Sequence, residues 1–281
     1  MRVGLVQLCS CDHPAENLIT LERMIREAHA GGAAFILTPE VSNIITSDRD
    51  HQSTVLSIEA DDPTLKRLRV VAEELSIWLL IGSLALKSGA ADGRFVNRCF
   101  LISPTGTIVA WYDKIHMFDV QLGNGEQYRE SAQFQPGDRA VVADTDFGKI
   151  GMTICYDLRF PHLHRTLAKL GASIITAPTA FTVPTGQAHW EVLLRARAIE
   201  TGSFILAPAQ CGTHQGDTTK NRKTYGHSII IDPWGRVLAQ AENTPCVTFA
   251  DLDLSLPQEV RAKIPALTHD REFKQPDDHQ Q

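Results

Sequence analysis

The sequence has no long hydrophobic run and no strong excess of charge of either sign. No segment approaches the about 20 consecutive apolar residues of a membrane-spanning helix, and the opening MRVGLVQLCSCDHP is too polar for an export signal. With a net charge of −6, the chain also lacks the basic field that attracts nucleic acid or anionic membranes. We therefore expect a cytoplasmic location and neither nucleic acid nor membrane as a partner.

Cysteine is sparse and shows no pairing pattern. A chain of 281 residues can build a large core without covalent cross-links, so we expect free thiols. Cys9 and Cys11 form a C-x-C pair, but no second pair stands at the spacing of a zinc finger, so we expect no metal. Cys211 is interpreted as a packed residue. The six cysteines are Cys9, Cys11, Cys99, Cys155, Cys211 and Cys246.

Short apolar strands alternate with helical segments along the whole chain, and no Gly/Ser linker divides it. The pattern includes two hairpins, at 95–112 and 226–240, so we predict mixed sheets in an α/β fold with a single domain over 1–281. The predicted strands are 3–8, 34–40, 77–86, 149–155, 172–178 and 204–210, and the predicted helices are 14–32, 62–76, one opening at Pro161, and 187–201.

Two similar strands suggest how the layers are arranged. FILTPE at 35–40 is similar to FILAPA at 204–209, as if two sheet halves faced each other in a four-layer α-β-β-α sandwich. The polar connection 115–137, with Gly123 and Gly125, is long enough to be functional. The tail from about residue 265 is rich in proline and charge and is expected at the surface or an interface.

Three reactive side chains stand where predicted strands end: Glu40, Lys114 and Cys155. Each alone has an ordinary explanation, as a solvated carboxylate, a surface lysine or a small buried thiol. The alternative is one hydrolytic site. Glu40 is then a general base whose pKa is raised by partial burial, and Lys114 is a cation beside a developing oxyanion.

The stretch KIGMTICYDLRFPHL, residues 149–163, favours Cys155 as a nucleophile. Its apolar run ends at Cys155, and Pro161 opens a helix soon afterwards. A strand, a sharp turn and a helix expose a nucleophile at the rim of a sheet. Because a thiol with a pKa of about 8.5 is only a few per cent ionised at neutral pH, Cys155 would need a base or a cation nearby.

The motifs FILTPE, YDKIH and GKIGMTICYDLRFP, in this order, resemble the nitrilase (carbon–nitrogen hydrolase) superfamily over nearly the whole chain. The resemblance implies the α-β-β-α sandwich, a Glu40–Lys114–Cys155 triad and no cofactor. It also implies a second glutamate beyond the lysine, and YRESAQFQPG places Glu130 there, where it would orient Lys114. A homodimer or larger homo-oligomer is expected on the same basis.

Finer motifs, among them PTAFTVPTGQAHWEVLLRARAIET, are similar to the branch that contains deaminated glutathione amidase and ω-amidase. The resemblance implies the backbone N–H of Tyr156 as an oxyanion donor, and Phe181 and Thr185 as walls of the substrate pocket. Arg159 is either a clamp for a substrate carboxylate or the partner of Asp157 or of another carboxylate at a helix end. The polar loop 213–224 departs from the branch, so the identity of the amide stays open.

Other chemistries remain possible on the same residues. His116 paired with Cys155 would make a papain-like thiol hydrolase, and His162 and His164 with Cys155 could hold zinc. Both are disfavoured, because His162 and His164 fall on an amphipathic helix, where a solvated face is common. A noncatalytic scaffold is the third alternative, although a scaffold has no physical need for all four reactive residues.

We expect a hydrolase of carbon–nitrogen bonds in linear amides, acting on a small carboxylate-bearing substrate through a thioester. The resemblance favours deaminated glutathione, which would yield α-ketoglutarate and cysteinylglycine. ω-Amidase action on α-ketoglutaramate is the alternative, since both substrates share the α-ketoglutaryl end.

Overall fold

The computed structural model describes residues 1–122, 127–217 and 222–273. Gly123 and Gly125, four residues of the polar loop 213–224 and the end of the tail lie outside the described residues. In the described ranges, no helix is both long and apolar enough to cross a membrane.

The first sheet has seven strands in the order β17-β1-β2-β3-β4-β5, with β8 paired to β4. β1, β2 and β3 run parallel to one another, whereas β17, β4 and β5 join by antiparallel pairing. The strands are β1 (Arg2–Gln7), β2 (Phe35–Leu37), β3 (Trp78–Lys87), β4 (Phe95–Ile102), β5 (Ile108–Asp113), β8 (Phe134–Gln135) and β17 (Cys246–Asp251).

The second sheet has six strands in the order β16-β15-β12-β11-β10-β9. Its central strands β10, β11 and β12 are parallel, and antiparallel strands complete both edges. The strands are β9 (Val141–Thr145), β10 (Gly148–Met152), β11 (Ile174–Thr176), β12 (Phe204–Ala207), β15 (Ile229–Ile231) and β16 (Val237–Gln240).

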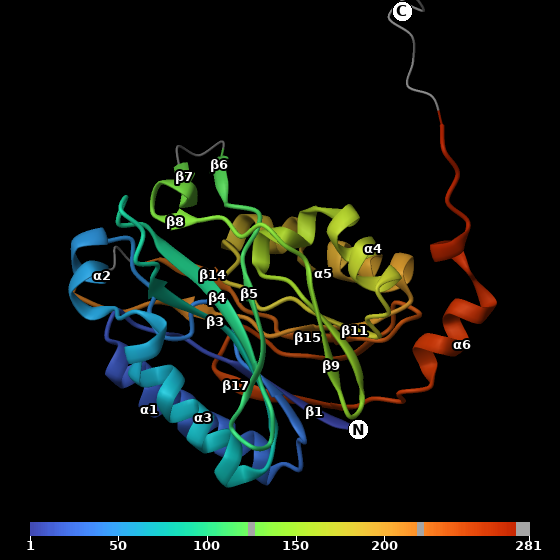
Figure 1. Cartoon of the computed structure of the whole chain (residues 1–281), viewed down its shortest axis with the longest axis horizontal. Helices are drawn as coiled ribbons and strands as arrows, with labels where there is room; N and C mark the ends of the chain where they lie inside the picture. The colour runs from blue at the N-terminus through green and yellow to red at the C-terminus, as the bar shows by residue number, and fades with distance from the viewer. Residues whose placement is uncertain (123–126, 218–221, 274–281) are drawn as a thin grey trace, which may run out of the picture.

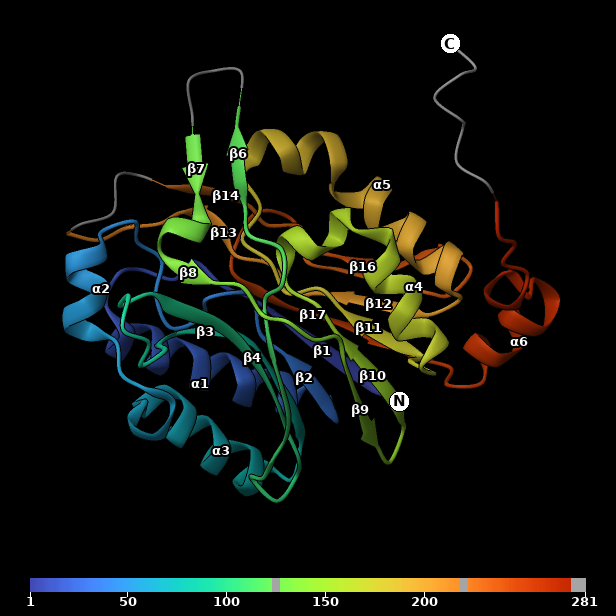
Figure 2. The ribbon, with the colours of Figure 1, turned by 45° about the horizontal axis from the view of Figure 1, so that its top comes forward.

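Helices cover the outer faces of both sheets (Figures 1 and 2). On the first sheet lie α1 (Pro14–Ala30) and α3 (Pro63–Leu75), and on the second lie α4 (Pro161–Lys169) and α5 (Val183–Thr201). The predicted α-β-β-α sandwich is confirmed. The remaining helices are α2 (Arg49–Val55), α6 (Leu256–Lys263) and the short 3₁₀ helices Glu59–Asp61, Glu130–Ala132, Cys155–Arg159 and Ala266–Thr268.

Central strands such as β1, β2, β11 and β12 read as continuous apolar runs because both of their faces are buried. In β1, Leu5 joins the core between the sheets, whereas its neighbour Val6 packs in the cluster beneath α1 and α3. The inner core contains Leu37 from the first sheet and Ile174 from the second. Two covered faces explain why these strands lack the polar alternation of a half-exposed sheet.

The sequence pattern missed several elements. Strands β9 and β17 and helix α2 were not predicted, and α5 begins at Val183, earlier than the expected 187. The connection 115–137 contains the antiparallel pair β6 (Asp119–Gln121) and β7 (Gln127–Arg129) as well as β8, so it is more ordered than a polar loop. Beyond β12, the chain forms another small ladder from β13 (Cys211–Thr213) and β14 (Lys223–Tyr225).

Candidate active site

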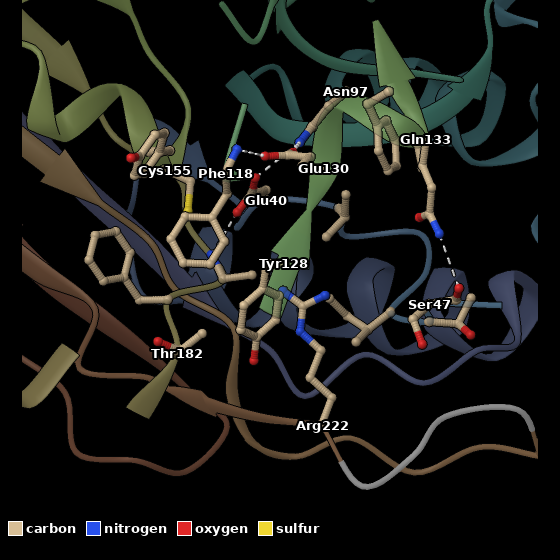
Figure 3. Close-up of a pocket in the computed structure, with 18 of the residues that line it drawn as sticks. Glu40, Ser47, Asn97, Phe118, Tyr128, Glu130, Gln133, Cys155, Thr182 and Arg222 are labelled. Atoms are coloured by element: carbon tan, nitrogen blue, oxygen red, sulfur yellow. Dashed lines mark hydrogen bonds between the residues drawn. The ribbon is translucent and has the colours of Figure 1, made fainter. Parts of the chain in front are cut away.

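Reactive residues from both sheets meet at one cavity of about 820 Å³ (Figure 3). Glu40 follows β2, Lys114 follows β5, and Cys155 follows β10, so each reaches the cavity just beyond a strand end. Glu130, in the 3₁₀ helix after β7, lines the same space. The structure thus brings the four predicted residues together, as expected where the carboxyl ends of parallel strands meet.

Lys114 is the centre of a buried charge cluster. Its Nζ lies 2.8 Å from Glu40 Oε1 and 2.8 Å from each carboxylate oxygen of Glu130, and the side chain is 2% exposed. Burial alone would lower the pKa of Lys114, but the charges of Glu130 and Glu40 outweigh it and raise this pKa well above 10.5. Lys114 is therefore a permanent cation.

Backbone and amide groups hold the two carboxylates in place. Glu40 Oε2 accepts a hydrogen bond from the Ala180 N–H at 2.8 Å, and Glu130 Oε2 accepts one from the Phe118 N–H at 2.6 Å. Asn97 Nδ2 donates to Glu40 Oε1 at 3.0 Å, from an inward position on β4. These donors, together with Lys114, fix the orientation of both carboxylates.

The expected rise in the pKa of Glu40 is wrong. Burial raises the pKa of Glu40, but the charge of the nearby Lys114 and its hydrogen bond have the larger combined effect. The pKa of Glu40 is therefore lowered below its usual 4.5. A hydrogen bond from the Cys155 thiol favours the ionised carboxylate as well. Glu40 is thus a carboxylate at neutral pH, ready to accept a proton.

Cys155 occupies a sharp turn between strand and helix. Its φ is +50°, a left-handed conformation that is uncommon for a residue with a side chain, and its N–H donates to the Pro178 carbonyl at 2.9 Å. Burial and the Glu40 charge raise the pKa of the thiol to about 12, although Lys114 opposes them. The resting site therefore holds a neutral thiol beside a carboxylate.

The residues expected to contact substrate divide into two groups. Tyr156, Phe181 and Thr185 line the cavity. Arg159 is not among the lining residues; its guanidinium lies 5.6 Å from the Phe181 ring centre and bonds to His189 Nδ1 at 3.2 Å. Its role as a carboxylate clamp stays a prediction.

Asp157 does not pair with Arg159, which was the alternative considered for that arginine. Its carboxylate accepts hydrogen bonds from the Tyr112 hydroxyl at 2.7 Å and from the Ile154 N–H at 2.8 Å, and it lies 2.7 Å from His116 Nδ1. Asp157 therefore fixes the turn that carries Cys155, and it holds His116.

The histidine alternatives find little support in this geometry. His116 stacks on Phe160, with ring centres 3.5 Å apart. His164 is fully buried, so the expected solvated position is wrong for this residue, and burial lowers its pKa to about 4. Within the described ranges, no group of three or more His, Cys, Asp or Glu side chains is placed to hold a metal ion.

The polar lining residues that sequence reasoning overlooked include Asn97 and Arg222. Asn97 interrupts the apolar strand FVNRCFLI, and an inward polar residue in such a strand is a signal that was available. Arg222 lies in the polar loop 213–224, for which the sequence indicated only a departure from the branch. Cys211, in contrast, is fully buried as expected but is not a lining residue.

Comparison with known proteins agrees with this arrangement. The sequence profile described as "Carbon-nitrogen hydrolase" matches residues 2–262. The chain belongs to the carbon–nitrogen hydrolase family. It is therefore a hydrolase that acts on carbon–nitrogen bonds in amides, which confirms the family and the reaction class predicted from the motifs.

Relatives within the carbon–nitrogen hydrolases cover almost the whole chain. Deaminated glutathione amidase of Yersinia enterocolitica is 38% identical over 96% of this chain and 92% of its own. The Caenorhabditis elegans NitFhit protein superposes with a TM-score of 0.89 at 33% identity, over 96% of this chain and 65% of its own. A mutant Nesterenkonia amidase carrying the acetamide moiety of fluoroacetamide on its active-site cysteine has a TM-score of 0.77 at 25% identity, covering 94% and 95% of the two chains.

Proposed function

We propose that the protein hydrolyses deaminated glutathione through a thioester on Cys155. The observation that carries this proposal is the convergence of a buried thiol, a carboxylate and a paired lysine at one cavity. The Nesterenkonia amidase, with its adduct on a cysteine, supports the role of the thiol.

The first step follows from the protonation state of the resting site. Because the thiol is neutral and Glu40 is ionised, Glu40 takes the Sγ proton as the sulfur attacks the amide carbon. The carbonyl π electrons move onto oxygen, and the oxyanion forms beside Lys114 and the Tyr156 backbone N–H. Both donors are in place before the charge develops, which is how such sites stabilise a transition state.

Glu40 then returns the proton to the leaving nitrogen, the C–N bond breaks, and an acyl thioester remains on Cys155. A water molecule loses a proton to Glu40 and attacks the thioester, and this proton passes to the departing thiolate. Glu130 touches Lys114 with both oxygens and acts by positioning it. One carboxylate thus serves as base and acid in turn.

Two observations favour deaminated glutathione over a smaller amide. The Yersinia enterocolitica relative carries that activity in its name. The cavity of about 820 Å³ lies in the upper part of the range for small-molecule sites, roughly 300–1,000 Å³, and exceeds what release of ammonia from α-ketoglutaramate requires. We propose that this space accepts the cysteinylglycine leaving group.

The test measures hydrolysis of deaminated glutathione by wild type and by Cys155→Ala, Glu40→Gln and Lys114→Met. We expect losses in kcat of at least about a thousandfold, since each change removes a nucleophile, a base or an oxyanion donor. Cys246→Ala, at a half-buried cysteine outside the cavity lining, is the matched control. Near-normal turnover by any of the three would refute the mechanism, and a wild type inactive on this substrate would refute the assignment.

A further inference from the structure

Arg222 is a half-buried cation in the cavity wall whose Nε finds no hydrogen-bond partner among the described residues. The ion pairs found among the described residues include none with Arg222. An unpaired, partly desolvated guanidinium is costly unless a ligand completes its hydrogen bonds.

The position of Arg222 is well anchored by its own backbone. Its carbonyl accepts a hydrogen bond from the His214 N–H at 2.9 Å, which closes the end of the β13–β14 ladder. His214 is held in turn, with Nδ1 2.7 Å from the Ser10 carbonyl and Nε2 2.8 Å from Thr224 Oγ1. Arg222 is therefore presented by a fixed framework.

The charge balance of the cavity calls for an anion near Arg222. The carboxylates among its lining residues are Glu40 and Glu130, and both already bond to Lys114. The other lining cations, Arg129 and Lys223, are exposed to solvent. Arg222 is thus the partly buried lining cation that is available to pair with an anionic group of a substrate.

Arg222 lies in a different part of the site from Arg159, the other arginine considered as a carboxylate clamp. Figure 3 shows its guanidinium across the cavity from Cys155, beside Tyr128. Its charge acts on Glu40, the group that protonates the leaving nitrogen, and helps to lower the pKa of that carboxyl. Arg159, in contrast, lies beside Tyr156 and Phe181, close to Cys155 in the chain.

We propose that Arg222 binds the terminal carboxylate of the peptide leaving group and so selects amides of an anionic peptide over amides that release ammonia. This inference rests on the proposed function. It adds the residue that binds the carboxylate at the end of the substrate farthest from the acyl group. A guanidinium suits the task because its two N–H groups match the two oxygens of a carboxylate.

The experiment compares kcat/KM for three substrates: deaminated glutathione, its C-terminal carboxamide and α-ketoglutaramate. Wild type is compared with Arg222→Met, with the conservative Arg222→Lys and with Arg23→Met, which removes an exposed cation outside the cavity lining. Because Arg222 also acts on Glu40, the informative quantity is the ratio between substrates, in which an effect on chemistry common to all three cancels.

In wild type we expect the carboxamide to react about 10- to 100-fold less efficiently than deaminated glutathione, mainly through KM. Arg222→Met should abolish this difference and lower the ratio of deaminated glutathione to α-ketoglutaramate by a similar factor. Arg222→Lys should recover part of both ratios, and Arg23→Met should leave them unchanged.

Ratios that stay unchanged in Arg222→Met would overturn the inference, whether or not all three substrates lose activity equally, because an equal loss reflects only chemistry or contacts that the three substrates share. Failure of the proposed function looks different, because wild type itself would then not hydrolyse deaminated glutathione. That outcome would remove both proposals before any variant is compared.

Discussion

Two clusters of alternating charge in this protein are built alike and differ in burial. At the site, Lys114 bridges Glu40 and Glu130; on the outer surface, arginines and glutamates of α1 and α3 bridge one another. In the surface cluster, Arg67 lies 2.6 Å from Glu22, a contact as short as those in the site. Similar distances therefore accompany very different environments.

Solvent exposure determines how strongly the charges of each cluster act on their surroundings. On the surface, hydrogen bonds from Arg67, and then from Arg26, lower the pKa of Glu22 to about 2, yet solvent screens the charges and limits their effect on stability. In the site, Lys114 is 2% exposed, so its charge is felt almost unscreened by the thiol and by any oxyanion. The buried cluster serves chemistry, and the exposed one joins two helices.

The largest effect is expected from Lys114→Met. Apart from the loss of activity, the variant leaves Glu40 and Glu130 buried without their counter-ion, which should lower the free energy of unfolding by about 3–5 kcal/mol. Urea denaturation of wild type and variant measures the difference. Adding Glu130→Gln should restore part of the stability but none of the activity, and a double variant no more stable than Lys114→Met would contradict this account.

A smaller but still large effect is expected from Gly82→Ala in β3. A Cβ at this position would lie 1.9 Å from the Thr38 carbonyl oxygen and 2.5 Å from Pro178, in the segments that lead to Glu40 and to Ala180. Displacing these segments should reduce kcat about a hundredfold, since small misplacements are costly in a preorganised site. Gly89→Ala is the control for lost stability without a displaced site: a Cβ there meets no atom within 4 Å, but φ is +74°, so the variant adds backbone strain outside the cavity lining and should leave kcat unchanged.

The pH dependence of kcat/KM reports on the buried cluster alone, because only its groups take part in the reaction. Since the pKa of Glu40 lies below 4.5, the base is ionised above that value and activity is lost only as pH falls through it. The pKa of the thiol is about 12 and that of Lys114 is well above 10.5, so no alkaline loss is expected below about pH 9. A rate profile that falls between pH 6 and 9 would show that Glu40 or Lys114 titrates differently.

The smallest effect is expected from Glu22→Gln in the surface cluster. The pKa of Glu22 is lowered from 4.5 to about 2, so its contribution is present above about pH 4.5 and disappears as pH falls toward 2. At pH 7 the loss of unfolding free energy should be at most about 1 kcal/mol, and it should shrink in 1 M salt. Thermal unfolding at both salt concentrations measures it, and a loss as large as that of Lys114→Met would break the comparison.

Much of the site could be predicted because its reactive residues stand at sequence boundaries. Glu40, Lys114 and Cys155 each follow an apolar run, and strand ends of a sheet converge in space. The sign of the pKa shift of Glu40 could not be predicted in the same way, because it depends on a 2.8 Å contact with a residue from a different strand. Burial can be guessed from sequence, whereas a counter-ion distance cannot.

The elements that were not predicted are positioned by contacts with residues far away in the sequence. Strand β17 has no fully buried side chain, and its pairing with β1, residue 2 to residue 251, is a property of the complete fold. Arg222 escaped for a related reason, since a cation in a polar loop becomes a site residue only when the ladder of β13 and β14 carries it to the cavity.

The pairing of β1 with β17 also bears on how the chain folds during synthesis. Strand β1 is synthesised long before residues 246–251, with which it forms its antiparallel ladder, and the Met1 nitrogen donates to the Leu252 carbonyl at 2.8 Å. Until those residues are made, one edge of β1 is open to strands of other chains. We therefore expect a nascent chain halted before residue 246 to depend on chaperones, and to be released from them when the ladder closes.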